Sequence, residues 1–334
     1  MPVIGIDVSK NKLHCALLSE AGKLKSKVFS NFPEGHILLL QWAGRLGQCQ
    51  AVQLHAVVEA TGVYHEAVAL SLHRAGVKVS ILNPAQVKHF AQGLAVKSKT
   101  DASDPVVLAR YGALVKPPPW EPPPPEITEL KALITRLEAI EGNMRRELNR
   151  IEKTTITGVP TAVRESLEKS VSFLKEEKVR LEKTIREHID QHPTLKQDRH
   201  LLESIPAVGP KTAWRMLTLF RARTFTRAPQ AAAYVGLVPI EHQSGTSVLK
   251  RPRLSKAGDA RLRAALYMAA VVATQYNPDI RRLYQRLIAR GKTKMSALGA
   301  AMRKLVHICF GVLKHQVRQK NLWASCGAGS LPSV

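Results

Sequence analysis

The sequence predicts an α/β domain followed by two helical regions, and three features of its 334 residues indicate this division. Residues 1–115 alternate short apolar runs with amphipathic stretches, as strands and helices do in α/β proteins. A proline-rich stretch at 116–125 then interrupts the chain, since proline fits neither a helix interior nor a central strand. Beyond this stretch, apolar residues recur at helical spacing.

Residues 1–115 contain five runs typical of strands and four segments typical of helices. The expected strands are VIGIDV at 3–8, NKLHCALLSE at 11–20, LKSKVFSN at 24–31, VQLHAVVEA at 52–60 and VKVSILN at 77–83. The expected helices cover residues 33–46, 62–76, 85–93 and 105–114. Three antiparallel strands leading into parallel crossovers, in the order βββαβαβα, are the order of a ribonuclease-H-like domain.

The rest of the chain predicts helices joined by short breaks. Residues 116–125 fall in KPPPWEPPPPE, which has seven prolines in eleven residues, and we expect a stiff extended linker there. Residues 126–195 carry narrow apolar stripes on both sides of a TGVP break, which predicts a coiled-coil hairpin, either closed within one chain or paired with a second copy. Residues 196–320 predict a compact, mainly helical domain, and residues 321–334 a flexible tail.

The composition favours a nucleic-acid partner. The chain has 50 Lys and Arg against 26 Asp and Glu, a formal charge of +24, and binding phosphates would release their counterions. Aromatic residues make up only 5%, so base stacking is not the expected main mode of contact. The four cysteines form no CxxC pair, which argues against zinc and for reduced thiols. With no signal-peptide pattern and no apolar run long enough to cross a bilayer, we expect a cytoplasmic, nucleoid-associated protein without a membrane partner.

Four acidic residues stand out in this basic sequence. Asp7 and Glu59 lie within apolar strands, where a carboxylate is costly unless it has a partner. Asp101 and Asp104 are three residues apart, and Asp104 precedes Pro105, a residue that suits the start of a helix. Each position also has a purely structural alternative, as a hydrogen-bond acceptor in a strand or as a helix N-cap.

Convergence of the four carboxylates would require compensating cations. Two carboxylates ~5 Å apart repel each other by roughly 3 kcal/mol at an effective dielectric constant of ~20. The lysines just upstream of the acidic pair offset part of this repulsion, and a hard divalent cation, Mg²⁺ or Mn²⁺, offsets a larger part of it. Two such ions can stabilise both the attacking and the leaving oxygen at a phosphate. The predicted catalytic acids and metal ligands are Asp7, Glu59, Asp101 and Asp104, and the flanking nucleic-acid-binding residues are Lys97 and Lys99.

Two segments of the helical region carry further basic residues. SIPAVGPKTA at 204–213 places a glycine turn between two helices, which can present backbone N–H groups to a phosphate; the alternative is a plain helix turn. LKRPRLSKAGDARLR at 249–263 is either a solvated face or a grip on a phosphate, which arginine can bind bidentately. The residues expected to contact nucleic acid here are Lys211, Arg251, Arg253, Lys256 and Arg263.

The motifs GIDVSK, VVEATG and KTDASD resemble the N-terminal motifs of IS110-type transposases and the related Piv-type DNA invertases. SIPAVGPKTA resembles their helix-hairpin-helix-like segment, and AAAYVGLVPIEHQSGTSV followed by RLSKAGDARLRAALYMAAVVAT resembles their C-terminal transposase domain. The resemblance covers nearly the whole chain except the linker and the tail. It implies a RuvC-like DEDD domain whose tetrad falls on Asp7, Glu59, Asp101 and Asp104, with Pro105 where the family usually has alanine.

The resemblance also implies a mechanism that residue spacing does not reveal. A serine of the C-terminal domain attacks the DNA phosphodiester and forms a covalent phosphoserine intermediate, and the matching residue is Ser244. By itself QSGTS is a polar turn, in which Thr246 and Ser247 are also hydroxyls. A serine needs activation, which metal held by the tetrad could supply. The implied partners are double-stranded DNA at the element ends and target, a structured non-coding RNA guide, and further copies of the chain in a dimer or tetramer.

Three other functions remain open beside a transposase or site-specific recombinase. A RuvC-like endonuclease using metal-activated water would need the four acids but no serine, and would leave a free 5′-phosphate. A non-catalytic nucleic-acid-binding protein would need neither. An actin-like sugar kinase shares a GIDVSK-like phosphate loop, but the sequence shows no second glycine-rich phosphate loop of that fold.

Overall fold

The computed structural model describes residues 1–60, 62–93, 104–244, 248–317 and 319. The chain divides into two compact units, residues 1–122 (unit 1) and 123–334 (unit 2). Among the residues singled out above, those outside the described ranges are Lys97, Lys99, Asp101, Thr246 and Ser247.

A mixed five-stranded sheet forms the centre of unit 1. Its strands are β1 (Val3–Val8), β2 (Lys12–Leu18), β3 (Leu24–Ser30), β4 (His55–Glu59) and β5 (Lys78–Leu82). They lie in the order β3-β2-β1-β4-β5, with β1, β2 and β3 antiparallel and β1, β4 and β5 parallel. This arrangement confirms the predicted ribonuclease-H-like fold, because the first three strands form an antiparallel meander and the later two join it in parallel through helical crossovers.

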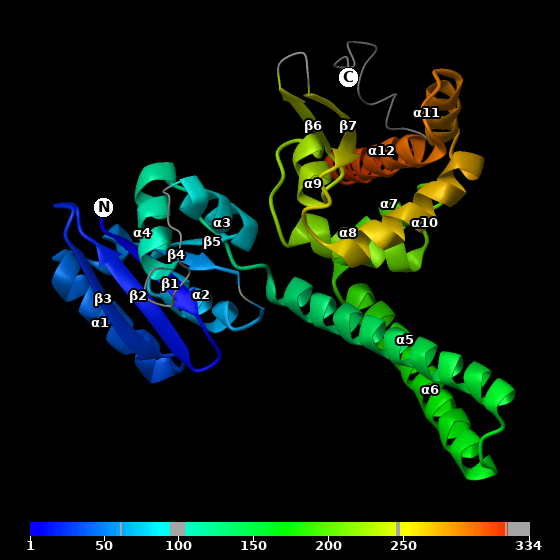
Figure 1. The fold of residues 1–334 in the computed structure, drawn as a ribbon, viewed down its shortest axis with the longest axis horizontal. Helices are drawn as coiled ribbons and strands as arrows, with labels where there is room; N and C mark the ends of the chain where they lie inside the picture. The colour runs from blue at the N-terminus through cyan, green and yellow to red at the C-terminus, as the bar shows by residue number, and fades with distance from the viewer. Residues whose placement is uncertain (61, 94–103, 245–247, 318, 320–334) are drawn as a thin grey trace. The chain divides into compact units, whose positions relative to one another are not determined.

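Helices cover both faces of this sheet (Figure 1). The helical segments of unit 1 are α1 (Pro33–Gly47), η1 (Ala51–Gln53), α2 (His65–Arg74), α3 (Pro84–Gly93) and α4 (Asp104–Val115). On one face Leu39 of α1 and Leu72 of α2 pack with Ile4 and Ile6 of β1. On the other, α3 and α4 pack on the opposite set of strand side chains through a core of Val3, Val57, Leu82, Val87, Val107 and Leu108.

Two glycines allow α4 to lie directly against the sheet. A Cβ atom on Gly5 of β1 would meet the Pro105 carbonyl oxygen at 1.9 Å and the Ala109 nitrogen at 2.4 Å. A Cβ atom on Gly112, near the other end of α4, would meet a methyl group of Val57 at 2.5 Å. The first turn of the helix therefore rests on β1 at Gly5 without an intervening side chain, and its later turns rest on the side chains of Val3 and Val57.

The first half of the proline-rich stretch is fixed on unit 1. The Trp120 amide donates a hydrogen bond to the Val79 carbonyl (2.7 Å), which covers part of the edge strand β5. Ser80 Oγ donates to the Pro118 carbonyl (2.8 Å) and accepts from Nε2 of His55 (2.8 Å). Burial, with help from the nearby Lys78 charge, lowers the pKa of His55 to about 4, so the imidazole is neutral at pH 7. Residues 117–120 thus belong to the packing of the sheet.

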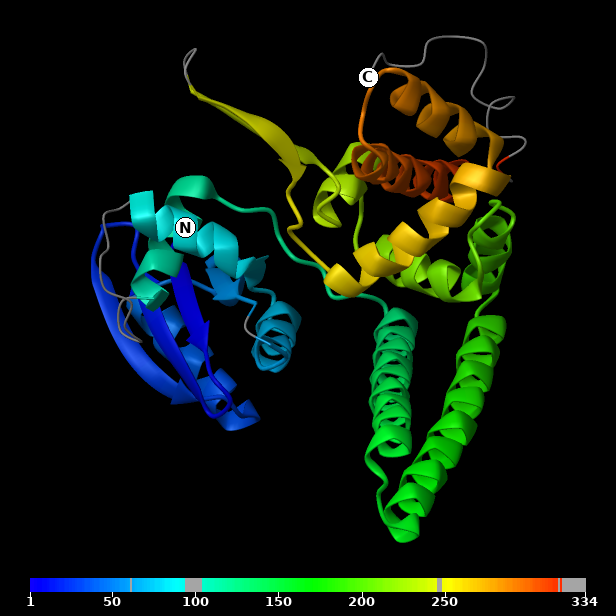
Figure 2. The same cartoon turned by 45° about the vertical axis from the view of Figure 1, so that its right-hand side comes forward.

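Unit 2 contains eight helices and a two-stranded ribbon within the described residues. They are α5 (Pro125–Thr157), α6 (Thr161–Gln191), α7 (Pro193–Glu203), α8 (Pro210–Arg221), α9 (Ala228–Tyr234), β6 (Pro239–Ser244), β7 (Val248–Leu254), α10 (Ala260–Tyr276), α11 (Pro278–Ala289) and α12 (Lys294–His315). Figure 2 shows α5 and α6 as a long hairpin leading into the compact group of shorter helices.

The α5–α6 hairpin is well packed at its base and poorly packed near its tip. The helices meet at the TGVP break, where Gly158 ends α5 in a left-handed conformation (φ 63°). The base residues of both helices join the core of unit 2: Ile127, Leu130, Ile134, Leu137, Ile140, Leu181, Ile185 and Ile189. Toward the tip, apolar side chains are exposed instead: Leu148, Ile156, Val163 and Phe173. One hairpin therefore leaves part of its own apolar stripe uncovered.

Helix α12 is the apolar centre of unit 2. By length and composition it is the one described helix that could cross a membrane, although half of its most apolar window is buried inside the protein. Its buried residues Ala301, Leu305, Ile308 and Val312 pack in the same core as the hairpin base. Burial of this kind is typical of a core helix.

Residues 196–320 are mainly helical in the described part of the chain, as expected, and the β6–β7 ribbon is an addition that the sequence did not indicate. Residues 239–244 pair antiparallel with residues 248–254, and the ribbon extends away from the helices of unit 2 (Figure 2). Pro252 is tolerated within β7 because each strand of a two-stranded ribbon has a free edge, where no ladder hydrogen bond is required.

We expect Gly5→Ala to lower the free energy of unfolding by about 2–3 kcal/mol, because its methyl group would displace the first turn of α4. Chemical unfolding of the full chain followed by circular dichroism measures this. Gly142→Ala is the control: its Cβ meets no atom within 4 Å inside α5, and alanine should stabilise this helix by about 0.5–1 kcal/mol. Equal effects of the two substitutions would contradict the close approach.

Candidate active site and nucleic-acid-binding residues

Asp7 and Glu59 occupy matching positions at the carboxyl ends of two neighbouring parallel strands. The register of β1 and β4 pairs Gly5 with Val57 and Ile6 with Val58, so the next pair along both strands is Asp7 with Glu59. Adjacent strands lie about 4.8 Å apart, and residues in register point to the same face. The carboxyl ends of parallel strands are also where sites form in α/β sheets. Both carboxylates are half-buried.

Asp104 lies above the same end of the sheet. Val3 and Val57 contact Gly112 of α4, so the alternating side chains of Asp7 and Glu59 point to the face that α4 covers. The first turn of α4 rests on Gly5 and its later turns rest on Val3, so the helix runs from the acidic end of β1 toward the other end. Asp104 is the first residue of α4 and is half-buried. Three of the four predicted acids thus share one face and one end of the sheet, and Asp101 lies outside the described residues.

His14 joins this face, although the sequence did not single it out. The antiparallel register of β1 and β2 places His14 directly opposite Asp7, and opposite residues share a face. The flanking Leu13 and Cys15 are buried on the other face, while His14 is half-buried. The position of His14 between the apolar residues Leu13 and Cys15 of the second predicted strand was the signal that could have identified it.

The chemistry of this donor set suits a hard cation. Oxygen ligands from carboxylates are those that Mg²⁺ and Mn²⁺ prefer, and two carboxylates side by side at a strand end require positive charge to remain ionised. Within the described part of the chain, no group of three His, Cys, Asp or Glu is close enough together to hold one ion. Further ligands for a cation beside Asp7 and Glu59 would come from Asp104, from the segment that contains Asp101, and from water or a bound phosphate.

Ser244 is the last residue of β6, where its backbone pairs with Val248 of β7. The ribbon that carries it is anchored at its base by two chain segments that cross closely. A Cβ on Gly236 (φ 79°) would meet the Ala257 carbonyl oxygen at 2.1 Å, and a Cβ on Gly258 (φ 92°) would meet the Tyr234 carbonyl oxygen at 2.1 Å. Only glycine permits this backbone contact, so the chain on both sides of the ribbon is held in place.

Arg263 stabilises the same crossing. Its Nη1 donates hydrogen bonds to the carbonyls of Val235 (3.2 Å), Ala257 (3.3 Å) and Gly258 (2.9 Å). This residue was predicted to contact nucleic acid; its observed contacts hold together the base of the ribbon. The other predicted basic residues differ: Arg253 and Lys256 are exposed, and the side chain of Arg251 lies outside the described part of the chain.

Lys211, also predicted to contact nucleic acid, bridges the two helices of the hairpin. Its ammonium group donates to Glu141 of α5 and Glu182 of α6 (3.0 Å to the latter). Partial burial would lower the pKa of Lys211, but the bonds to both carboxylates together raise it. The positive charge near the turn between α7 and α8 is therefore balanced by the hairpin.

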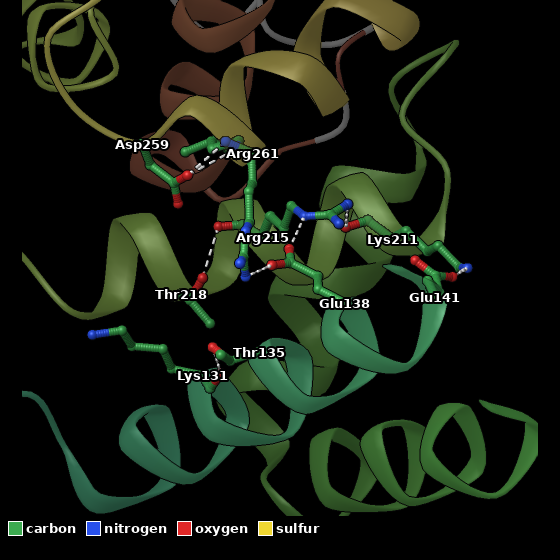
Figure 3. Close-up of polar contacts among 10 residues, drawn as sticks. Lys131, Thr135, Glu138, Glu141, Lys211, Arg215, Thr218, Asp259 and Arg261 are labelled. Atoms are coloured by element: carbon green, nitrogen blue, oxygen red, sulfur yellow. Dashed lines mark hydrogen bonds and ion pairs between the residues drawn. The ribbon is translucent and has the colours of Figure 1, made fainter. Parts of the chain in front are cut away.

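Glu138 of α5 makes a second connection of this kind (Figure 3). One oxygen accepts from Nε of Arg215 in α8 (2.8 Å), and the other accepts from Nη1 of Arg261 in α10 (3.0 Å). The Glu138 side chain is only 14% exposed and that of Arg215 19%. This carboxylate joins the hairpin base to two helices of the compact group, including the helix that follows the ribbon.

Comparisons with known proteins agree on one family. Residues 4–156 match the family model of IS110 DEDD transposases, and residues 199–285 match the transposase family IS116/IS110/IS902. The pilin gene-inverting protein of Moraxella lacunata is 32% identical over 93% of this chain and 95% of its own length. An uncharacterized 43.6 kDa protein of insertion element IS110 from Streptomyces coelicolor is 31% identical over 47% of this chain.

Among solved structures, RuvC of Thermus thermophilus bound to a Holliday junction is 20% identical and covers 34% of this chain, with a TM-score of 0.25. A match this weak adds nothing to the strand order and the family matches, which support a RuvC-like fold by themselves.

We expect Glu138→Gln to lower the free energy of unfolding by about 1–3 kcal/mol, since it leaves the half-buried Arg215 without its counter-charge. The matched control is Glu168→Gln, which removes an exposed i,i+4 pair with Arg164 and should cost less than about 0.5 kcal/mol. Chemical unfolding of both variants gives the comparison, and a Glu138 effect no larger than the control would refute a structural role for this contact.

Proposed function

Because the chain belongs to the IS110 transposase family, a family of DNA transposases and recombinases with a RuvC-like DEDD domain, we propose that it cuts and rejoins DNA through a phosphoserine intermediate formed by Ser244. The observation that carries this proposal is the pairing of two features in one chain. Carboxylates gather at one end of the unit 1 sheet, and a serine ends a strand of an anchored ribbon in unit 2.

The proposed reaction is a transesterification at phosphorus. Oγ of Ser244 attacks the scissile phosphate, the Ser244 Oγ–P bond forms, and the bond from phosphorus to one DNA strand breaks. The serine proton is lost to a base, and the departing DNA oxygen takes up a proton to become a hydroxyl. In the reverse step a DNA hydroxyl attacks the phosphoserine and releases the serine. The energy of the phosphodiester is retained, so strands can be rejoined without another energy source.

The acidic residues are proposed to hold the metal that this chemistry needs. Asp7, Glu59, Asp101 and Asp104 would hold Mg²⁺ or Mn²⁺, which when bound stabilises negative charge on the phosphate oxygens. Asp7 and Glu59 are the best supported of the four, because the strand register places them side by side. The residues themselves orient the ions, and Lys97 and Lys99 are proposed to contact the nucleic acid beside them.

The proposed partners are double-stranded DNA at the element ends and target, a structured non-coding RNA guide, and further copies of this chain. The net charge of +24 and the 5% aromatic content support a protein that binds phosphate backbones and leaves sequence recognition to base pairing. The exposed apolar residues toward the hairpin tip, such as Ile156 at 83% and Phe173 at 61%, support a dimer or tetramer in which another hairpin covers them. We propose that these assemblies act in the cytoplasm, on the nucleoid.

Ser244→Ala should abolish the covalent protein–DNA adduct that survives denaturation, and lower strand exchange by about 10³-fold or more, with DNA binding retained. Denaturing gel electrophoresis of labelled DNA after reaction detects the adduct. The neighbouring hydroxyls provide controls, since Thr246→Val and Ser247→Ala should keep it. An adduct that persists in Ser244→Ala would show that Ser244 is not the nucleophile. Cleavage by the wild-type protein that leaves a free 5′-phosphate and no adduct would favour a water-dependent endonuclease.

Asp7→Asn and Glu59→Gln should each lower strand cleavage by about 10²–10³-fold while changing DNA affinity little, because they remove metal ligands and not phosphate contacts. Chelation of divalent ions should abolish cleavage by the wild-type protein, and Mg²⁺ or Mn²⁺ should restore it. Both variants should unfold at the wild-type temperature or above it, since carboxylate repulsion is relieved. The exposed Glu34→Gln in α1 is the charge-matched control. Full cleavage in chelator would overturn the metal role.

A further inference from the structure

The positive charge of the chain is not evenly distributed. Residues 280–334 contain eleven Lys and Arg and no Asp or Glu. Five of these cations lie on α11 and the turn that follows it, and all five are exposed. We call this set the α11 cationic surface: Arg281, Arg282, Arg286, Arg290 and Lys292.

The amphipathic pattern of α11 turns these side chains outward. Ile280 is fully buried, and Leu283 and Leu287 follow it at helical spacing as half-buried residues. This side of the helix faces the core, with α11 on the outside of unit 2 next to α10 and α12 (Figures 1 and 2). Arg282, Arg286 and Arg290 follow one another at four-residue intervals, about 6 Å apart along the helix axis. They form a row along the outer side of α11.

Helix α6, which is also exposed, pairs many of its charges within the helix. The pairs on α6 are Arg164 with Glu168 (2.9 Å), Arg180 with Glu177 (2.7 Å) and Lys183 with Glu187 (3.7 Å). In α11 the sole carboxylate is Asp279, which bonds Arg282 (2.7 Å) and accepts from Gln319 (3.0 Å). Like charges four residues apart destabilise a helix, so this row is not explained by the stability of α11. A row in which Arg282 alone has a carboxylate partner on the helix, while Arg286 and Arg290 have none there, is suited to binding a polyanion.

We propose that the α11 cationic surface binds the phosphate backbone of duplex DNA, as a contact separate from the basic segment at 249–263. Arginine binds phosphate bidentately, and the row of arginines is long enough to reach successive phosphates along one strand. Contacts to phosphate are independent of base sequence, so this surface would position DNA and not select it. The proposal rests on the proposed function only in taking DNA as the substrate; it does not depend on Ser244 or on the metal.

The test removes three charges that have no role in the ion pairs of α11: Arg286→Gln, Arg290→Gln and Lys292→Gln together. Glutamine removes the charge, stays polar and has a helix propensity close to that of arginine, which matters for Arg286 within α11. In the full-length protein, affinity for a mixed-sequence DNA duplex should fall about 10–100-fold at ~0.15 M salt, and the slope of log affinity against log salt should decrease by about 2.7. Fluorescence anisotropy at several salt concentrations measures both. The melting temperature should stay the same or rise, which separates lost binding from lost folding.

The matched control removes the same charge from α6: Arg164→Gln, Arg180→Gln and Lys183→Gln together. Its DNA affinity should fall less than about threefold, since these cations are already paired. Equal losses in both triple variants would overturn the proposal, because net charge alone would then explain them. Lost binding of a structured RNA with unchanged DNA binding would overturn the choice of DNA. The DNA-affinity measurements are repeated with both triple variants in the Ser244→Ala background. The same difference between them there would show that binding by the α11 cationic surface does not require the proposed nucleophile.

Discussion

The contact between α4 and β1 at Gly5 is the constraint on which the candidate active site depends. The strand register alone places Asp7 beside Glu59, but the third acid comes from a helix 97 residues further along the chain than Asp7. That helix reaches the sheet only because Gly5 has no side chain, which allows the Pro105 carbonyl to lie directly over β1. A small residue inside a strand usually weakens it; here the missing side chain creates room for a functional group.

Acidic residues have two different uses in this basic protein. In unit 1 they gather at one end of a sheet, where their mutual repulsion favours a bound cation. In unit 2 they neutralise arginines and lysines at the hairpin base, as Glu138 does for Arg215 and Arg261. On the surface of α11 a single carboxylate, Asp279, pairs with Arg282, and the other cations have no acidic partner on that helix. Its charge is left open because, in our proposal, the compensating anion is DNA.

The ribbon that carries Ser244 is held in place by contacts at its base, away from the serine itself. Two strands with free edges have little intrinsic stability. Their base is fixed by the crossing at Gly236 and Gly258 and by the three carbonyls that Arg263 binds. An arginine in a basic run was a reasonable candidate for a phosphate ligand, and Lys211 was another. Arg263 and Lys211 both donate hydrogen bonds to protein groups, so in this structure they hold chain segments in position.

The sequence by itself determined the order of strands and helices along unit 1, the hairpin and its break at Gly158, and the two acids embedded in apolar strands. These features follow from local periodicity, turn residues and the cost of an isolated buried carboxylate, all of which act over a few neighbouring residues. Only the tertiary structure decided that α4 lies on Gly5, that His14 faces Asp7, that residues 239–254 form a ribbon, and that Lys211 and Arg263 bind protein groups. Each of these contacts depends on which distant segment packs against a given residue. Such long-range packing produces no periodic pattern of apolar residues in the sequence.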